Sequence, residues 1–265
     1  MSNPSNVSGV EAFKRNTEAM FSVLSIIDPA LRSWHQNGCV VTLAGQHMIT
    51  YSGVLVLDDS AITAEWVAEL GAMFSRDAVP LAFEFCTPTE TPSCAGFLES
   101  LGYQRTICDL VMSLDGAITP STPSGNVIFN PKVSVSAESS DQSMQAYWQI
   151  MVEGFGMPTN AARGAFETML RMTESRQLLA RLDGDPVGSG MLLCCGGASV
   201  IYNVATLPTA RRQGVGTAMM VALHEMALKS GYSGTVLAVQ SNEALQLYTK
   251  LGYKIDGYRS IYSVE

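Results

Sequence analysis

A glycine-containing segment in the second half of the chain has the residues of an anion-binding turn. The run from Asn203 to Thr217 predicts a strand, a turn and the start of a helix, with Arg211-x-x-Gly214-x-Gly216 where the helix begins. Two residues without side chains leave the N–H groups of the first helical turn accessible, at the positive end of the helix dipole. Phosphate and pyrophosphate groups bind at such positions. The segment therefore predicts a site for a nucleotide-like cofactor in an enzyme.

The next predicted helix carries a second pair of candidate residues, Asn242 and Tyr248. Asn242 stands just ahead of the helix, where we expect it to cap the helix end. A tyrosine phenol is protonated at neutral pH and can donate that proton to a leaving group. The alternative is that Tyr248 only anchors its helix, because Leu247 and Leu251 beside it are packing residues.

The elements that position these residues follow the order α-α-β-β-β-α-β-α-β. Apolar spacing and turn residues define them. The predicted helices are Asp141 to Gly154, Ala161 to Thr173, Gln213 to Ser230 and Asn242 to Lys250. The predicted strands are Gln177 to Leu182, Val187 to Cys195, Ser199 to Thr206, Thr235 to Val239 and Tyr258 to Val264.

A stretch rich in proline, glycine, serine and threonine divides the chain, and it predicts a linker over residues 120–130 between domains 1–119 and 131–265. The two sides resemble each other at a constant offset, since Phe97 to Tyr103 matches Leu247 to Tyr253. We interpret this as two copies of one α/β fold, the alternative being a chance match between two helix ends.

Only the second copy keeps the glycine turn. At the same offset, Ala61, Ala64 and Trp66 occupy the positions of the arginine and the two glycines, and Leu98 occupies that of the tyrosine. A tryptophan in that place blocks the approach of a phosphate to the backbone. The first copy is therefore expected neither to bind a nucleotide in this way nor to be catalytic.

This element order, with Arg211-x-x-Gly214-x-Gly216 and Asn242-x-Ala244-x-x-x-Tyr248-x-x-x-Gly252-Tyr253, resembles the GNAT superfamily of acetyl-CoA-dependent N-acetyltransferases. The resemblance covers residues 127 to 265 well and residues 8 to 115 as a degraded copy. It implies an α/β fold class with tandem GNAT-like folds, each a mixed central sheet flanked by helices. It also implies direct acetyl transfer from acetyl-CoA, as cosubstrate and without a metal, to a primary amine.

The resemblance further implies residue roles. In the family the glycine turn holds the pyrophosphate of coenzyme A, and the strand before it splays from its neighbour and pairs with the pantetheine arm. The implied cofactor-binding residues are Val204, Ala205, Thr206, Arg211, Arg212, Gln213, Gly214, Val215, Gly216, Thr217 and Asn242. Tyr248 is the implied general acid for the leaving thiolate.

The group that accepts the amine proton is left open. Some family members place a glutamate on the strand before the turn, but Ser199 to Ala205 contains no acid. Tyr202, Asn203 or a water held by them could take the role. Glu153 could do so, could bind a cationic acceptor, or could be a solvated helix-end carboxylate. His224 is expected on the exposed side of its helix without a chemical role.

Composition limits the remaining classes. A formal net charge of −8 and a pI near 4.9 argue against a protein that coats nucleic acid. No apolar run approaches the roughly 20 residues that cross a bilayer, and no secretory signal begins the chain. Six cysteines without Cys-x-x-Cys spacing favour reduced thiols in the cytoplasm. Three isolated histidines make no metal motif.

Two other functions remain as alternatives. A regulatory or sensor module would bind an acyl-CoA with little turnover, and the missing strand glutamate is its best support. The other alternative is an interaction protein whose second copy is vestigial. The intact glycine turn argues against it. For an enzyme, the acceptor is a small-molecule amine or a peptide N-terminus. Edge strands in this fold often pair between subunits, which leaves a homodimer open.

Overall fold

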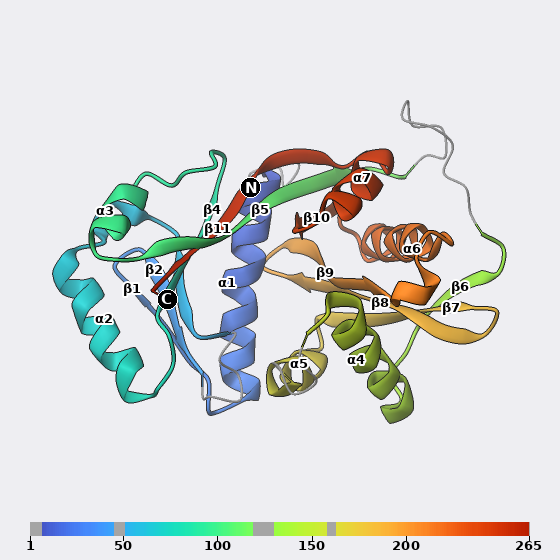
Figure 1. Ribbon diagram of the computed structural model, residues 1–265, viewed down its shortest axis with the longest axis horizontal. Coiled ribbons are helices and arrows are strands. Elements are labelled where there is room, and N and C mark those ends of the chain that lie inside the picture. The colour runs from blue at the N-terminus through green and yellow to red at the C-terminus, as the bar shows by residue number, and fades with distance from the viewer. Residues whose placement is uncertain (1–6, 45–50, 119–129, 158–162, 265) are drawn as a thin grey trace.

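Eleven strands form one continuous mixed sheet in the order β1-β2-β3-β4-β11-β5-β10-β9-β8-β7-β6 (Figure 1). The computed structural model describes residues 7–44, 51–118, 130–157 and 163–264. The N-terminal elements are α1 (Gly9–Ile27), β1 (Arg32–Gln36), β2 (Cys39–Leu43), β3 (Gly53–Val56), the 3-10 helix η3 (Asp59–Ala61), α2 (Ala64–Arg76), β4 (Ala82–Thr87), α3 (Ala95–Ser100) and β5 (Gln104–Asp115). The C-terminal elements are β6 (Val133–Ala137), α4 (Asp141–Phe155), α5 (Arg163–Leu170), β7 (Ser175–Leu182), β8 (Asp185–Cys195), β9 (Ala198–Thr206), the 3-10 helix η4 (Pro208–Ala210), α6 (Val215–Lys229), β10 (Gly234–Val239), α7 (Asn242–Lys250) and β11 (Lys254–Ser263).

The predicted α/β class is confirmed, and each helix and strand predicted for the second half is present with its ends displaced by a few residues. The prediction missed β6, which pairs antiparallel with β7 at the edge of the sheet. Its sequence Val-Ser-Val-Ser-Ala alternates between apolar and polar residues, as strands with one buried face do. Serines beside a Pro- and Ser-rich linker concealed that alternation.

The last strand of each half of the sequence is inserted into the sheet beside the other half. β11 pairs antiparallel with β4 and with β5, and β5 pairs antiparallel with β11 and with β10. Figure 1 shows β5 and β11 as long strands that run together between the N-terminal and C-terminal elements. The predicted linker lies outside the described residues except for Asn130, and the division of the sequence into two domains stays a prediction. In space, neither sequence half holds its own sheet alone.

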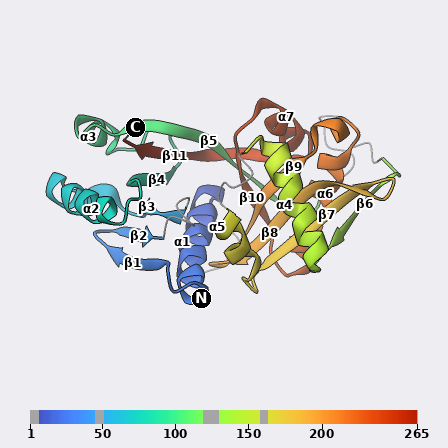
Figure 2. The same cartoon turned by 60° about the horizontal axis from the view of Figure 1, so that its bottom comes forward.

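Helices cover both faces of the sheet. α1, α4 and α5 share one apolar cluster with strand residues such as Val40 and Met191, and Figure 2 brings these three helices to the front. α2 and α3 pack on the opposite face through a cluster that includes Val41. α6 and α7 do the same in the second half through a cluster that includes Leu192. Neighbouring residues of one strand thus enter different cores, because strand side chains alternate between faces.

The two halves repeat one connection scheme. β3-α2-β4-α3-β5 and β9-α6-β10-α7-β11 each run strand–helix–strand–helix–strand, and in each the first two strands are parallel. The helices and strands recur at the offset seen in the sequence. This arrangement supports the interpretation of the N-terminal half as a degraded copy, which stays a prediction.

His224 lies in the core, so its predicted exposed position is wrong. Its Nε2 is 2.6 Å from the carbonyl oxygen of Gly116 and its Nδ1 is 2.7 Å from the hydroxyl of Thr235. A carbonyl only accepts, so Nε2 carries the proton and Nδ1 accepts from Thr235, which in turn accepts from the Tyr253 hydroxyl at 2.6 Å. Burial lowers the pKa of His224, which keeps the ring neutral as this chain of bonds requires. The expectation failed because α6 is apolar on most of its surface.

Asn16 fixes α1 to the second half of the sheet. Its fully buried side-chain amide donates to the carbonyls of Leu193, Cys195 and Ala198 at 3.1 to 3.3 Å, around the turn between β8 and β9. Its side-chain oxygen accepts from the Tyr202 hydroxyl at 3.3 Å. One buried side chain thus bonds to the turn between β8 and β9 and to Tyr202, and it links α1 to this part of the sheet.

Replacement of Asn16 by leucine, which has a similar volume, should destabilise the protein by about 2–4 kcal/mol, because buried carbonyls lose their donor. Urea unfolding followed by circular dichroism measures this change. Ser22→Ala on the exposed side of α1 is the control and should stay within about 0.5 kcal/mol of wild type. A loss below about 1 kcal/mol for Asn16→Leu would contradict the anchoring role.

Residues 130–265 expressed alone should aggregate or form oligomers, because removing β5 leaves the edges of β10 and β11 unpaired. Co-expression with residues 1–118 restores both ladders, and the two chains should then co-purify as one particle. Size-exclusion chromatography and thermal melting measure both outcomes. A monomeric fragment 130–265 that unfolds cooperatively would show that the exchanged strand is dispensable.

Candidate functional site

The N-terminus of α6 is open. Gly214 is its N-cap residue, and among the described residues no side chain caps this helix end. The first helical hydrogen bond is the one from the Ala218 N–H to the Gly214 carbonyl at 3.0 Å, so the N–H groups of the first turn remain available. Side-chain oxygens cap four other helices, α1, α2, α4 and α7, through Ser8, Thr63, Ser140 and Ser241. An anion fits where the cap is missing.

Both glycines of the turn have little room for a side chain. Gly214 has φ +84°, and a Cβ there would lie 3.2 Å from the Cβ of Asn130. A Cβ on Gly216 would lie 3.1 Å from Leu247 Cδ2, so this glycine lets α6 pack closely against α7. Close packing of α6 against a strand is permitted by glycines of β8, where a Cβ on Gly190 would meet Met219 and Leu223 of α6.

The two arginines of the turn differ in their surroundings. Arg211 donates from Nη2 to the Gly154 carbonyl at 3.0 Å and from Nε to the Thr206 carbonyl at 3.5 Å. It therefore ties the turn to the end of α4 and to β9. Arg212 is exposed and adopts a left-handed φ of 62°, which turns the chain into the helix. The resemblance implies that both bind the cofactor, and these contacts add a structural role for Arg211.

β9 separates from β10 just before the turn. Their parallel pairing is confined to Val200 with Val236 and Ile201 with Leu237. A register shift in the β8–β9 pairing coincides with a left-handed Asn203 (φ 57°), the mark of a β-bulge that bends the strand. Val204, Ala205 and Thr206 follow this bulge and line the space that opens between the two strands. Backbone groups at this edge of β9 thus face a cavity instead of a neighbouring strand.

A cavity of about 1660 Å³ passes through this opening. On one face of the sheet it is lined by α6, α7 and their turn, and on the other by α1, α4 and the strands β4, β5 and β11. Its charged residues at the α6–α7 end are Arg211, Arg212, Glu243 and Lys250. The cavity connects the open helix end with the opposite face of the sheet, so two ligands can meet inside the sheet.

Tyr248 lines the cavity from α7. It is 7% exposed, and its ring centroid lies 5.9 Å from that of Tyr253. Burial raises the pKa of Tyr248 to about 12, so the phenol is protonated at neutral pH. A protonated phenol at the wall of the cavity is in the state that proton donation needs.

Asn242 does not cap α7, which corrects the sequence-based expectation. The cap is Ser241, whose hydroxyl oxygen accepts from the Ala244 N–H at 3.2 Å. Asn242 is the first residue of the helix, is exposed, and is not among the residues that line the cavity. Its contact with coenzyme A stays a prediction.

The candidates for the proton acceptor are not equally placed. Glu153 is exposed and is not among the cavity-lining residues. Tyr202 lines the cavity, but its hydroxyl donates to Asn16 and burial raises its pKa well above the usual range. A phenol of this kind holds its proton at neutral pH and is a poor base. Asn203 lines the cavity through the bulge of β9.

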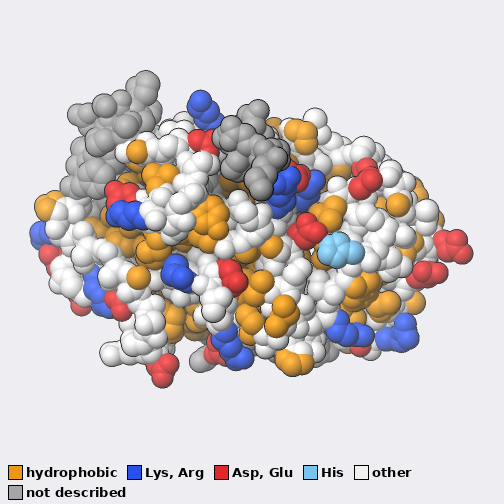
Figure 3. All heavy atoms as spheres, turned by 180° about the vertical axis from the view of Figure 1, so that it is seen from behind, with side chains coloured by type: hydrophobic (Ala, Val, Ile, Leu, Met, Phe, Trp, Pro, Cys, Tyr) orange, Lys and Arg blue, Asp and Glu red, His pale blue; other side chains and the backbone are white. Residues whose placement is uncertain are grey.

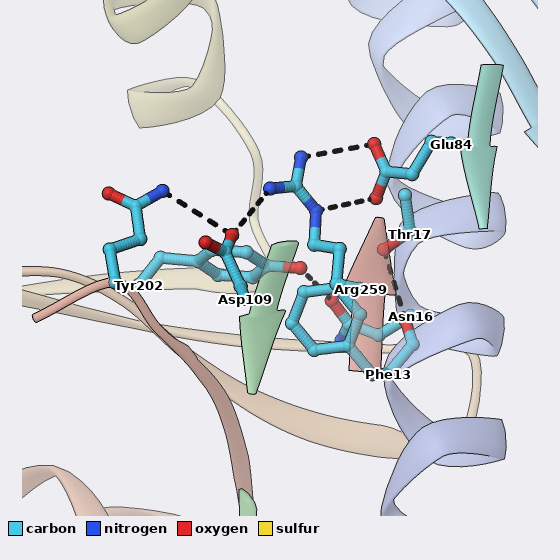
Figure 4. A network of polar contacts seen from close by, with 8 residues as sticks. Phe13, Asn16, Thr17, Glu84, Asp109, Tyr202 and Arg259 are labelled. Atoms are coloured by element: carbon cyan, nitrogen blue, oxygen red, sulfur yellow. Dashed lines mark hydrogen bonds and ion pairs between the residues drawn. The ribbon is translucent and has the colours of Figure 1, made fainter. Parts of the chain in front are cut away.

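Sequence reasoning missed an ionic cluster on the opposite wall. Arg259 of β11 donates to both oxygens of Glu84 of β4, at 2.8 and 3.1 Å, and to Oδ2 of Asp109 of β5 at 3.0 Å (Figure 4). Gln240 donates to the same Oδ2 at 3.4 Å. The four residues all line the cavity. The available signals were Glu84, the single acid of the short strand β4, and Asp109, which directly precedes the apolar run Leu110 to Met112 of β5.

The corresponding end of α2 in the first half is closed. Thr63 Oγ1 accepts from the Trp66 N–H at 3.3 Å, and the Trp66 side chain is 4% exposed within the local core. Leu98, which aligns with Tyr248, is fully buried in the same core. Thr63 thus satisfies one N–H of the first turn and Glu65 adds a negative charge there, so this helix end disfavours a phosphate.

Three further findings concern the charged surface, membrane spans and metal sites. On the face seen in Figure 3, basic and acidic side chains are interspersed. None of the described helices combines the length and the apolar character that a membrane span requires. The described residues contain no group of three histidine, cysteine or acidic side chains arranged to hold a metal ion.

Residues 173–255, from just before β7 into β11, match the model of the acetyltransferase (GNAT) domain. No curated protein matches the chain. A GCN5-related N-acetyltransferase from Kribbella flavida has a similar fold, with a TM-score of 0.72 at 18% identity over 95% of this chain and 95% of that one. A tandem GNAT protein from the clavulanic acid biosynthesis pathway gives 0.64 at 14% identity over 97% and 94%. A GCN5-related N-acetyltransferase from Sphaerobacter thermophilus gives 0.62 at 14% identity over 95% and 91%.

The region from residue 173 to residue 255 therefore has the sequence pattern of an acetyltransferase (GNAT) domain. The fold is similar over nearly the whole length to the Kribbella flavida structure and to the tandem GNAT structure, which extends the similarity to the N-terminal half.

Proposed function

We propose that this chain transfers the acetyl group of acetyl-CoA directly to a primary amine. The observation that carries the proposal is the uncapped end of α6 at the mouth of a cavity that crosses the sheet where β9 and β10 separate. The open N–H groups suit a pyrophosphate, and the free edge of β9 suits an extended amide-bearing arm. A thioester carrier needs both features at once.

The residues fit such a carrier one by one. Backbone groups of Arg212, Gln213, Gly214, Val215, Gly216 and Thr217 would hold the pyrophosphate, and those of Val204, Ala205 and Thr206 would pair with the pantetheine arm. Arg211 would support them through its bonds to the Gly154 and Thr206 carbonyls. A Cβ on Gly214 would crowd Asn130 and one on Gly216 would crowd Leu247, so a substitution at either glycine would disturb the setting of the turn. Bound acetyl-CoA would supply an activated acetyl group.

The chemistry needs a proton donor on the carrier side. The neutral amine nitrogen attacks the thioester carbon, the new C–N bond forms, and the C–S bond breaks. The departing sulfur takes the proton of Tyr248, which regains one from solvent, while the excess proton on nitrogen also passes to solvent. Tyr248 is protonated at neutral pH and lines the cavity, as this role requires.

The second candidate function is an acyl-CoA-binding sensor with little turnover. The observation in its favour is that β9 carries no acidic residue beside the opening. Location in the cytoplasm and formation of a homodimer stay predictions from the sequence. The residues described up to this point are compatible with either a small-molecule amine or a peptide N-terminus as the acceptor.

Gly214→Ala should weaken coenzyme A binding at least about tenfold, because a left-handed alanine shifts the N–H groups that the phosphates need. Isothermal titration calorimetry with coenzyme A measures the affinity. Gly102→Ala is the matched control, since Gly102 is also left-handed (φ +90°) but has open space around its Cβ position. Both variants carry similar backbone strain, and only Gly214→Ala should lose affinity. Equal affinities would remove the basis of the proposal.

Tyr248→Phe should lower kcat about a hundredfold, with coenzyme A affinity retained, because only the proton donor is lost. Release of free thiol from acetyl-CoA in the presence of an amine panel measures turnover. Tyr258→Phe, outside the cavity-lining residues, is the control for the loss of a phenol. An unchanged kcat in Tyr248→Phe argues for another proton donor, and no turnover with any amine in the wild type favours the sensor.

A further inference from the structure

The wall of the cavity opposite the carrier turn holds more negative than positive charge. Glu84 and Asp109 are both acids, and a single guanidinium, that of Arg259, lies between them. The side chains are 17%, 5% and 20% exposed respectively, so solvent compensates this imbalance poorly. The group carries a formal excess of one negative charge.

The pairing of the strands produces this cluster. Arg259 lies directly across from Asp109 in the β11–β5 ladder, and on the other side it lies across from Cys86, two residues beyond Glu84 on β4. Residues two apart on a strand share a face, so Glu84 points to the same side of the sheet. That side is the one covered by α1, whose Phe13 packs with Cys86 and Val111.

Each nitrogen of Arg259 already donates to an acid, and three of its five N–H groups are used in this way. Its Nε and Nη2 donate to Glu84 and its Nη1 donates to Asp109. Both oxygens of Glu84 accept from this guanidinium. Two acids already balance the charge of this guanidinium, so an acceptor carboxylate would add to the negative excess of the cluster.

Asp109 keeps one free oxygen. Arg259 and Gln240 both donate to Oδ2, and among the described residues no donor lies within hydrogen-bonding distance of Oδ1. Burial raises the pKa of this carboxyl, and the guanidinium offsets the effect only in part. A buried carboxylate with an unused oxygen gains most from a cationic hydrogen-bond donor.

The rest of this wall is apolar and aromatic. Phe13 and Tyr202 lie beside the ionic cluster in Figure 4, with ring centroids 6.0 Å apart. Met20, Phe21 and Tyr51 continue the lining of the cavity from the N-terminal half. Phe21 and Tyr51 make an edge contact at 6.4 Å. These side chains suit an apolar body and offer little to a polar chain.

We propose that the acceptor is a cationic amine with an apolar body and no neighbouring carboxylate, whose ammonium group binds Oδ1 of Asp109. This inference rests on the proposed acetyl transfer and names its substrate class. Glu84 and Arg259 position Asp109, and Glu84 adds the charge that repels an acceptor carboxylate. Free amino acids are thereby disfavoured, and the ammonium loses its proton to solvent before it attacks.

Three probes of matched shape test this assignment. 2-Phenylethylamine carries the ammonium, 2-phenylethanol replaces it with a hydroxyl, and phenylalanine adds a carboxylate next to it. Each is titrated calorimetrically into the full-length protein at neutral pH, with and without saturating coenzyme A. The amine should bind at least about tenfold more tightly than either analogue, because a charge-assisted hydrogen bond to Asp109 is worth about that much.

Asp109→Asn should raise the Kd of the amine at least about tenfold and leave the Kd of the alcohol unchanged, because only the carboxylate charge is removed. In acetyl transfer the same variant should raise KM with kcat largely retained. Asp185→Asn, an exposed residue without contacts in the site, is the matched control and should change neither constant. Glu84→Gln removes one negative charge from the wall, as Asp109→Asn does, and replaces it in the binding experiment if the Asp109→Asn protein does not fold.

Equal binding of the three probes, no binding of the amine, or unchanged amine affinity in both variants would overturn the inference. These outcomes can be distinguished from a failure of the proposed acetyl transfer. Acetyl transfer that does not respond to Asp109→Asn leaves the transferase intact and removes the acceptor site. Amine binding that depends on Asp109, without any transfer, supports the site and removes the transferase.

Discussion

The pairing of β11 with both β4 and β5 is the interaction on which the rest of the structure depends. It places Arg259 between Glu84 and Asp109, residues that are otherwise remote in the sequence. It also places β5 beside β10, and β5 pairs with every residue of β10 from Gly234 to Val239. Because β10 is paired with β5 along its whole length, β10 can separate from β9 after Ile201 and leave only its β9-facing edge unpaired. The opening in the sheet and the ionic wall thus have a common cause.

The two halves connect their strands and helices in the same order, but the N-termini of the corresponding helices α2 and α6 differ. In α2 a threonine cap and a buried tryptophan close the first turn, whereas in α6 Gly214 and Gly216 leave it open. These features are local, since a cap, a left-handed glycine and a bulky side chain act within a few residues of chain. For that reason the sequence alone could predict the open turn, the helix with Tyr248 and the difference between the two halves.

Features that depend on distant pairing could not be predicted. No short pattern shows that Asp109 lies across from Arg259, because this needs the exchange of two strands separated by most of the chain. His224 was misplaced for a similar reason, since its partner Gly116 comes from the other half. The error at Asn242 is a local one. Both Asn242 and its neighbour Ser241 have side chains that can cap a helix, and only the backbone conformation distinguishes them. Lone acids within apolar strands are the signal most useful for such sites.

The charges of the cavity are divided between its two ends. Near the α6 turn lie three cations and one acid, together with the positive end of a helix dipole. On the opposite face of the sheet lie two carboxylates around one guanidinium. A polyanionic carrier and a cationic amine would therefore each be favoured at one end and disfavoured at the other, so that neither blocks the site of its cosubstrate. On this proposal the N-terminal half, although its own helix end is closed, supplies Glu84, Asp109 and α1 as the wall that selects the acceptor.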